Sequence, residues 1–374
     1  ISSVYTGDGK RVEHILPGGR KLTRTFDSID RIKQISDTTT GNSFVAGMDW
    51  IGPGLRLLRR AHGNDTVLTH LNDSADAVMG YDAVKRVTRM RLTDQGGDQL
   101  LDREYGYNRA DALTFERRIE DNNLTDNYTY DSIYRVETAA FDLGSGGIRR
   151  NNEKLEYTYD GVGNRRQVRE TNTQTGIRDI DYRVNEVNQY TEIGSVSRNH
   201  SNNGNLLDDS NRMYAYDYKN RLVEVKDKGS GSIIATYKYF CDNRRTSKSV
   251  DANETRYYYD GRQVCEEQDD TGNTLLTYVY SPTYVDAPIQ LERTVFHPEG
   301  AGIVYLHQNE RSDVVAATNS SGEVVERRFY DDFGQAYDED KQSTIESSIG
   351  NPYGFQGRRL DAETGLYYFR NRYY

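Results

Sequence analysis

Hydrophobic and polar positions alternate in short runs along most of the chain. In residues 155–159, "LEYTY", the Leu and both Tyr residues fall on one face of an extended strand, and Glu and Thr fall on the other. The next letters, "DGVGN", are turn chemistry, because Gly tolerates positive φ and because Asp and Asn bond to nearby backbone groups. The return strand, from Arg165, mixes charged and β-branched residues. The stretch therefore predicts a β-hairpin with its aromatic side chains on one strand.

This hairpin pattern recurs along the sequence at steps of roughly 20–29 residues, the length of two short strands and their turns. Clear copies are "NYTYDSIYRVET" (127–138) and "MYAYDYKNRLVEV" (213–225), and upstream copies carry Phe26 or Trp50 in the aromatic place. Two weaker copies fill the longest gap in the series. The second Tyr of the motif, or its equivalent, falls at Tyr81, Tyr107, Tyr130, Tyr159, Tyr216, Tyr239, Tyr259, Tyr280, Tyr305 and Tyr330.

No segment shows a 3.6-residue apolar stripe, so we expect an all-β protein: a long antiparallel ribbon of about 24–30 strands. Strands twist, so a ribbon of this length should coil on itself, with each repeat stacked on its neighbours as in a spiral solenoid. The motif positions expected to hold the hairpins together are Tyr157, Tyr159, Asp160, Gly163, Asn164, Arg165, Tyr214, Tyr216, Asp217 and Arg221.

The composition supports an ordered but unusually polar fold. Hydrophobic residues make up only 35% of the 374 residues, yet there are 30 Tyr, which disordered chains do not carry. The mean hydropathy is −0.87. A Tyr ring buries apolar area while its hydroxyl stays wet, which suits a sheet with both faces near water. The net charge of −10 gives no electrostatic case for binding nucleic acid through its phosphates.

The two cysteines, Cys241 and Cys265, allow one disulfide but no disulfide framework, and no Cys/His spacing resembles a zinc site. No apolar run reaches the length of about 18 residues that a membrane span needs. The opening residues, "ISSVYTGDGK", read as the middle of a repeat rather than as a signal peptide. We therefore expect a fragment of a longer polypeptide, cut at both ends.

The tandem "YxYDxxxNR" copies resemble the YD repeats of bacterial Rhs proteins, of the related Tc-toxin B/C shells and of animal teneurins. The most specific part is C-terminal, where four stretches follow one another in the order of the Rhs core-associated region. They are "YYYDGRQVCEE" (257–267), "YVYSPTYVDAPI" (278–289), "YLHQNERSDVVAATNSSGEVVERRFYDDFGQ" (305–335) and "NPYGFQGRRLDAETGLYYFRNRYY" (351–374). With the upstream repeats, the resemblance covers essentially the whole chain.

The resemblance implies a strand ribbon wound in a spiral into a hollow shell, which in family members encloses a toxic C-terminal polypeptide or presents an adhesive surface. Toxin members cleave themselves at a segment rich in Asp-Pro-x-Gly that follows an "RYYDP" stretch. No Asp-Pro-x-Gly sequence occurs in this chain. We therefore assign no catalytic residue and expect no cofactor.

Residue clusters that could carry chemistry are sparse. The six His residues are scattered without visible partners, so we expect ordinary structural histidines. The acidic pairs Asp269-Asp270, Asp331-Asp332 and Glu339-Asp340 lack the spacing of known calcium loops. No Gly-x-Ser-x-Gly elbow, P-loop or dinucleotide fingerprint appears, and "DLGSGGI" and "KGSGSI" are better read as hairpin tips. The chain is therefore predicted not to be an enzyme and to hold no metal.

The Tyr rows have two interpretations. Exposed aromatic side chains on a sheet can stack on sugar rings, and carbohydrate binding has been proposed for YD-repeat proteins as a class. Alternatively, Tyr ladders on neighbouring strands hold the sheet together through cross-strand pairs worth roughly 0.2–1 kcal/mol each. We favour the structural interpretation, because the regular spacing suits a sheet better than one binding pocket.

The C-terminal block departs from the repeat rhythm, and we predict that it closes or plugs one end of the spiral. We expect Arg358 and Arg370 to meet Asp361 or Glu363 there. The organisation predicted is tandem YD repeats over 1–256, the repeats of the core-associated block over 257–350, and the closing motif over 351–374. The motif residues in that last segment are Phe355, Gly357, Arg358, Asp361, Gly365, Tyr367 and Arg370.

The leading hypothesis is a non-enzymatic shell of an exported bacterial Rhs-type protein, extracellular or at the cell surface, that encloses and delivers a C-terminal toxin polypeptide. The alternative is an adhesion or carbohydrate-binding module that contacts cell-surface glycans or proteins. A third hypothesis is end-to-end self-association into a filament through open sheet edges.

Overall fold

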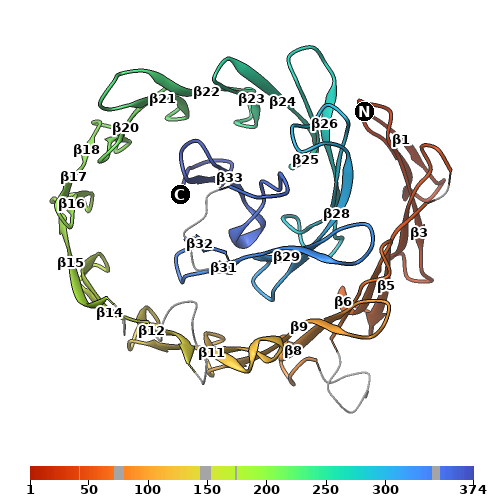
Figure 1. Ribbon diagram of the computed structural model, residues 1–374, viewed down its shortest axis with the longest axis horizontal. Helices are drawn as coiled ribbons and strands as arrows, with labels where there is room; N and C mark the ends of the chain where they lie inside the picture. The colour runs from red at the N-terminus through yellow and green to blue at the C-terminus, as the bar shows by residue number, and fades with distance from the viewer. Residues whose placement is uncertain (42, 71–79, 144–152, 173–174, 339–345) are drawn as a thin grey trace. The chain divides into compact units, whose positions relative to one another are not determined.

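The predicted all-β antiparallel ribbon is confirmed. The computed structural model describes residues 1–41, 43–70, 80–143, 153–172, 175–338 and 346–374. These residues form 34 strands, each consecutive pair of hydrogen-bonded strands running antiparallel, and two single-turn 3-10 helices (Figure 1). The number exceeds the 24–30 strands expected, because several strands have only two or three residues and leave no alternation to recognise.

The chain divides into two compact units, of which the first combines residues 1–103 with 253–369 and Tyr374. Its N-terminal ribbon runs through β1 (Ser2–Tyr5), β2 (Arg11–Ile15), β3 (Lys21–Phe26), β4 (Ile32–Asp37), β5 (Ser43–Ile51), β6 (Arg56–His62), β7 (Val67–Thr69) and β8 (Arg89–Thr93). Its C-terminal ribbon comprises β24 (Asn253–Asp260), β25 (Gln263–Gln268), β26 (Thr274–Tyr280), β27 (Pro288–Arg293), β28 (Gly302–Gln308), β29 (Val314–Thr318) and β30 (Val324–Arg327). Two short hairpins follow, β31 (Phe329–Tyr330) with β32 (Ala336–Tyr337), and β33 (Arg359–Asp361) with β34 (Leu366–Tyr368), separated by η2 (Phe355–Gly357).

The second unit comprises residues 104–252 and 370–373, and strand β9 (Gln99–Tyr107) runs across the division. It contains β10 (Leu113–Arg118), η1 (Ile119–Asp121), β11 (Leu124–Tyr130), β12 (Val136–Leu143), β13 (Lys154–Tyr159), β14 (Arg165–Asn172), β15 (Gly176–Val184) and β16 (Tyr190–Ile193). It continues with β17 (Val196–Ser197), β18 (Asn199–His200), β19 (Leu206–Asp208), β20 (Arg212–Tyr216), β21 (Leu222–Asp227), β22 (Ile233–Tyr239) and β23 (Arg245–Val250). The division by motif (1–256, 257–350 and 351–374) stays a prediction.

The hairpin 155–170 forms for the reasons that its sequence indicated. The Asp160 amide donates to the Asn164 carbonyl at 2.9 Å, and the Gly163 amide donates to the Asp160 carbonyl at 3.2 Å. Gly163 has a φ of +98°, which an L side chain rarely adopts. The β13–β14 register shifts between Thr158 and Tyr159, so one residue bulges at the turn.

The C-terminal ribbon of the first unit buries more of its side chains than the strands of the second unit do. Strands of the second unit alternate between buried and accessible positions, as in β13, whereas β26 to β29 are buried on both faces. On one face lies an apolar cluster that includes Tyr278, Leu291 and Leu306 and is covered by Tyr353. The other face meets the N-terminal ribbon, and Figure 1 shows β26 to β29 between β1–β6 and the β33 segment. The C-terminal ribbon is therefore the middle layer of its unit.

Candidate functional site

Many of the repeat turns are held by the carboxylate of the motif aspartate. An asparagine takes its place at Asn108, Asn185, Asn309 and Asn319. Asp160 Oδ1 accepts the amides of Val162 at 3.0 Å and Asn164 at 2.8 Å, and its Oδ2 accepts the Asn164 side-chain amide at 2.8 Å. These bonds, the Asn164 side chain first, lower the pKa of Asp160. In the copy at Asp217, Arg221 takes the place of the asparagine and donates through Nε at 2.7 Å. The same pattern is built on Asp27, Asp82, Asp131 and Asp269.

The second aromatic residue of the motif ties one repeat to the one before it. The Tyr159 hydroxyl donates to the backbone carbonyl of Val136 at 2.6 Å, at the start of the preceding return strand. Where Trp replaces Tyr, Trp50 Nε1 makes the equivalent bond to the Ile32 carbonyl at 2.9 Å. The same bond is made by Tyr81, Tyr130, Tyr239, Tyr280 and Tyr330. The register of β12 with β13 begins at Thr138 and Glu156, so the Tyr159 hydroxyl adds a clamp between repeats at the end of that ladder.

The arginine of the motif reaches forward to the next repeat. The Arg135 guanidinium lies 4.4 Å from the ring centre of Tyr159, and Arg221 lies 5.0 Å from that of Tyr239. Arg221 also donates through Nη1 to the Phe240 carbonyl at 2.7 Å. A cation over an aromatic face is worth about 0.5–1 kcal/mol at an exposed site. These contacts therefore link each repeat to the next one along the chain, in the manner of a solenoid.

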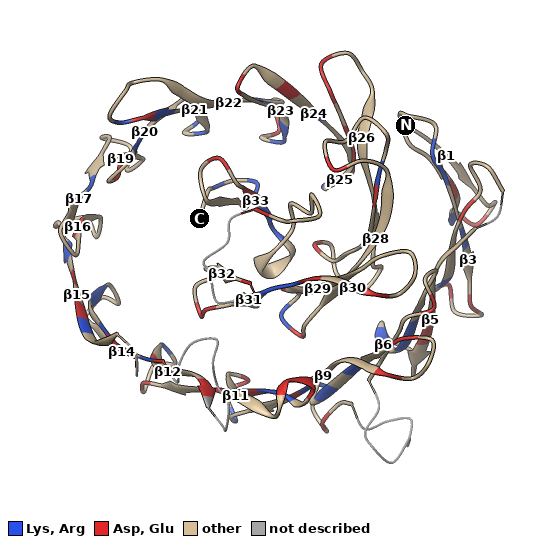
Figure 2. Cartoon of the chain, in the orientation of Figure 1, with Lys and Arg blue, Asp and Glu red and all other residues tan. Residues whose placement is uncertain are grey.

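A polar layer joins the two ribbons of the first unit. Arg20 donates to Asp37 at 2.7 Å, to Thr277 at 2.7 Å and to Gln290 at 2.6 Å, and it lies 3.0 Å from Glu292. A second contact is the two-bond pair of Arg11 with Asp260, at 2.8 and 2.6 Å. Figure 2 shows basic and acidic residues interspersed along these strands. Sequence reasoning missed this layer, since the only signal for it was polar residues at alternate positions of otherwise apolar strands.

Four of the six histidines are buried in this unit: His14, His62, His70 and His307. The His62 and His307 rings lie 5.0 Å apart, and Arg60 Nε donates to His62 Nε2 at 3.3 Å. In the part of the chain that the structure describes, one ring nitrogen of each of the four has no hydrogen-bond partner. Burial, and for three of them the positive charge of Arg60, holds their pKa values below the ordinary 6.5. These histidines are far apart in the sequence, which is why they were described as scattered from the sequence alone.

The C-terminal block packs on the apolar face of the middle layer. Arg359 forms two bonds to Glu267, at 2.6 and 2.7 Å, and Tyr278 donates to the same carboxylate. The rings of Tyr353 and Tyr278 meet edge to face, with centres 5.2 Å apart. The chain passes so close to the Asp286 carbonyl at Gly357 that a Cβ there would overlap it. Buried contacts therefore hold the C-terminal block against the middle layer.

Comparison with known proteins places these features in a family. The model of the teneurin YD-shell matches residues 53–374, most of the chain. The chain belongs to the teneurin YD-shell family. The fold of this YD-shell chain agrees with solved Tc toxin structures. Against the Photorhabdus luminescens Tc holotoxin pore the TM-score is 0.79 at 18% identity, over 100% of this chain and 19% of that chain. Against the TcdB2–TccC3–Cdc42 crystal structure it is 0.75 at 18% identity, over 100% and 20%.

Curated relatives of the YD-shell chain are bacterial. The tRNA3(Ser)-specific nuclease WapA of Bacillus spizizenii is 33% identical over 221 residues, 59% of this chain and 9% of the relative. The tRNA nuclease WapA of Bacillus subtilis is 31% identical over 223 residues, again 59% and 9%. The chain thus spans less than a tenth of the length of these relatives.

The first tyrosines of the YD motif are buried, Tyr157 at 5% exposure and Tyr214 at 6%. Tyr216 is half-buried, and burial raises its pKa to about 12. Arg165 lies 5.0 Å from the ring centre of Tyr182 and donates its backbone amide to the Tyr190 hydroxyl at 2.9 Å. The motif rings therefore offer little free surface for stacking on a sugar.

The predicted residues of the closing motif lie in several different environments. Arg358 pairs with Asp286 at 2.9 Å, a partner that the sequence did not indicate. Asp361 is fully buried, and its carbonyl accepts the amide of Gly365 at 2.8 Å. Phe355 and Tyr367 are buried with ring centres 6.1 Å apart, and Arg370 follows β34 with a φ of +63°. That Arg358 and Arg370 meet Asp361 or Glu363, and that the block closes a spiral, stay predictions.

The remaining predictions concern the cysteines, metal sites, membrane spans and the two glycine-rich segments. Cys241 and Cys265 are free thiols, the second buried. In the described part of the chain no three His, Cys, Asp or Glu residues gather as metal ligands. The same part contains no helix long and apolar enough to cross a bilayer. "KGSGSI" forms the β21–β22 tip, while "DLGSGGI" and Glu339-Asp340 extend into sequence outside the described residues.

Proposed function

We propose that this chain is a non-enzymatic section of the wall of a hollow YD-repeat shell, in an exported, extracellular or cell-surface bacterial protein of the Rhs type. The shell encloses a toxic polypeptide encoded on the C-terminal side of the same protein and delivers it. The membership of the YD-shell family supports the structural role. The names of the WapA relatives, which are tRNA nucleases, support a toxin as cargo.

The observation that carries the proposal is the anchored C-terminal block. The block lies on one face of the middle layer while the N-terminal ribbon covers the other. Its central ion pair, Arg359 with Glu267, is buried on both sides, at 8% and 2% exposure. Breaking such a pair by removing one partner costs about 3–5 kcal/mol, so the layers resist separation. A wall of locked repeats and fixed layers suits containment better than reversible recognition.

The test uses the native full-length gene product. We expect intact-mass measurement to find a separate small polypeptide that co-purifies with the shell and survives added protease. The variant Glu267→Ala should loosen the wall and make that polypeptide protease-sensitive. The matched control is Glu323→Ala, because Glu323 is exposed and its carboxylate accepts a bond from Asn319 of its own turn, at 2.8 Å.

A single uncleaved chain with no protected fragment would contradict the proposal. The adhesion alternative would then be tested at Tyr218, which is 85% exposed and has the Lys219 ammonium 5.8 Å from its ring centre. Loss of glycan or cell binding in Tyr218→Ala would favour it. Growth of scattering with concentration would favour end-to-end filaments instead.

A further inference from the structure

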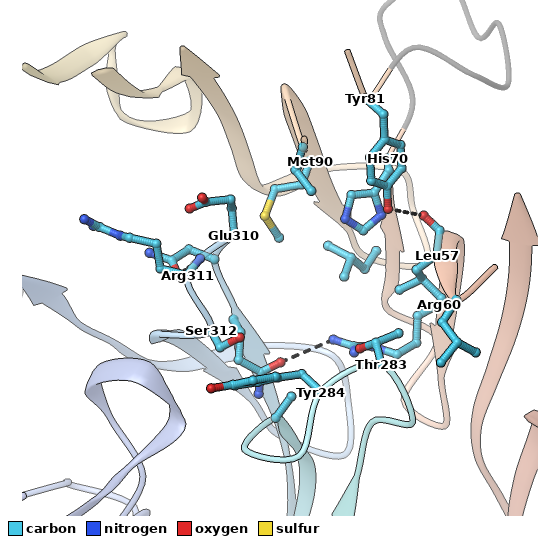
Figure 3. Close-up of a pocket in the computed structure, with 16 residues that line it drawn as sticks. Leu57, Arg60, His70, Tyr81, Met90, Thr283, Tyr284, Glu310, Arg311 and Ser312 are labelled. Atoms are coloured by element: carbon cyan, nitrogen blue, oxygen red, sulfur yellow. Dashed lines mark hydrogen bonds between the residues drawn. The ribbon is translucent and has the colours of Figure 1, made fainter. Parts of the chain in front are cut away.

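A cavity of about 450 Å³ opens between the two ribbons of the first unit. Its volume falls in the range of small-molecule sites, roughly 300–1,000 Å³. Apolar side chains of the N-terminal ribbon, Leu57 and Leu68, form part of its lining. Tyr81 and His70 stack in one wall with ring centres 5.2 Å apart, and the exposed Tyr284 stands opposite (Figure 3). The cavity thus offers aromatic and aliphatic surface to an apolar group.

Arg60 gives this cavity a positive charge. The side chain is 3% exposed and extends from β6 into the space that Figure 3 shows. Arg60 donates through Nη2 to Gln308 Oε1 at 3.5 Å and through Nε to His62 Nε2 at 3.3 Å. Both hydrogen bonds are long, and both acceptors are uncharged. Among the residues described, no carboxylate pairs with Arg60.

The surroundings of Arg60 do not offset this charge. His62, His70 and His307 are its ionisable neighbours, and burial together with Arg60 keeps each of them neutral near pH 7. His70 is 7% exposed, and its Nδ1 has no hydrogen-bond partner among the described residues. Burial without a counter-charge lowers the pKa of Arg60 to about 10. Taking a lone guanidinium out of water costs several kcal/mol unless an anion compensates it.

We propose that this cavity binds a small organic carboxylate with an apolar body, its carboxylate on Arg60 and its body between the His70–Tyr81 stack and Tyr284. A planar guanidinium matches a carboxylate in two-bond geometry. The charged residues of the lining are Arg60, Arg311 and Glu310, a net charge of +1 that suits a monocarboxylate better than a phosphate dianion. The site is independent of the shell function proposed above.

The experiment titrates the 374-residue chain with 4-phenylbutyrate, followed by calorimetry and by saturation-transfer NMR. The neutral analogue 4-phenylbutyramide tests the need for charge on the unmutated protein. Inorganic phosphate, added as a competitor, tests whether any anion suffices. We expect binding of the carboxylate, at least tenfold weaker binding of the amide, and no competition by phosphate.

Two variants locate the site. Arg60→Met keeps the length and apolar stem of the side chain and should weaken binding by about ten- to hundredfold. The matched control is Arg59→Met, because the neighbouring Arg59 is exposed and pairs with Asp49 at 3.6 Å. Tyr284→Ala, at an exposed position, should weaken binding without affecting the fold. The proposal is overturned if the carboxylate does not bind, if amide and carboxylate bind alike, if phosphate displaces the ligand, or if folded Arg60→Met binds as the parent does.

Discussion

Acidification from about pH 7 to about pH 5 should strongly destabilise the first unit through its buried histidines. His70 and His307 lie between the ribbons, at 7% and 1% exposure. Burial first, and the charge of Arg60 second, lower the pKa of His70 to about 4 and that of His307 to about 3 from 6.5. Arg327 adds to the effect at His307, and His62 lies beside it with a pKa that is also lowered.

The direction of the effect follows from the lowered pKa values. A histidine whose folded pKa lies below 6.5 is more readily protonated in the unfolded chain, so protons favour unfolding. The stabilising contribution is complete above pH 6.5 and is lost as the pH falls toward the folded pKa. At about pH 5 the unfolded histidine is mostly charged and the folded one mostly neutral, which costs about 2 kcal/mol each. The two together cost about 4 kcal/mol, a large share of a typical domain stability of about 5–15 kcal/mol.

The assay is guanidinium chloride denaturation at a series of pH values, followed by fluorescence of Trp50. This is the only tryptophan in the sequence, and it lies in β5 of the same unit. His307→Gln should remove about a quarter of the pH dependence, because His14, His62 and His70 also have lowered pKa values. The introduced amide can still bond to Thr318 but does not titrate. His200→Gln, in the other unit, should leave it unchanged. Equal midpoints at pH 7 and pH 5, or full pH dependence in the His70→Gln, His307→Gln double variant, would refute the reasoning.

Two further predictions test the contacts within and between layers. Tyr159→Phe removes the hydroxyl clamp between repeats and should lower the free energy of unfolding by about 1 kcal/mol in thermal denaturation, whereas Tyr218→Phe should have no effect. Glu267→Ala leaves Arg359 buried and unpaired and should cost about 3–5 kcal/mol, while the double change Glu267→Met, Arg359→Met should recover much of the loss. A double variant as unstable as the single one would show that the charge pair itself, not the unpaired cation, sets the cost.

The hairpins could be predicted from the sequence because their causes are local. The aspartate, the left-handed turn position and the following arginine or asparagine act within five residues, as at Asp160 to Asn164. The alternation of Tyr157 and Tyr159 on one face is set by strand geometry alone. The clamp from Tyr159 to Val136 was not predicted, although its regular recurrence in the aromatic positions was the signal.

The layering of the first unit could not be predicted, because it joins residues far apart in the chain. Arg20 meets Thr277 and Gln290, and nothing near any of them in the sequence indicates the others. Arg358 illustrates the same limit. The structure pairs it with Asp286, and nothing near Arg358 in the sequence indicates that partner.

The sequence by itself determined the family, the all-β class and the repeat, since turn chemistry and a two-residue alternation are properties of neighbouring residues. Only the tertiary structure decided which strands are buried on both faces, which histidines gather and where Arg60 lies without an anion. Burial depends on what covers a strand, and here the cover comes from the opposite end of the chain. The charged residues that matter most to stability and binding are therefore ones that the pattern of residues along the sequence did not single out.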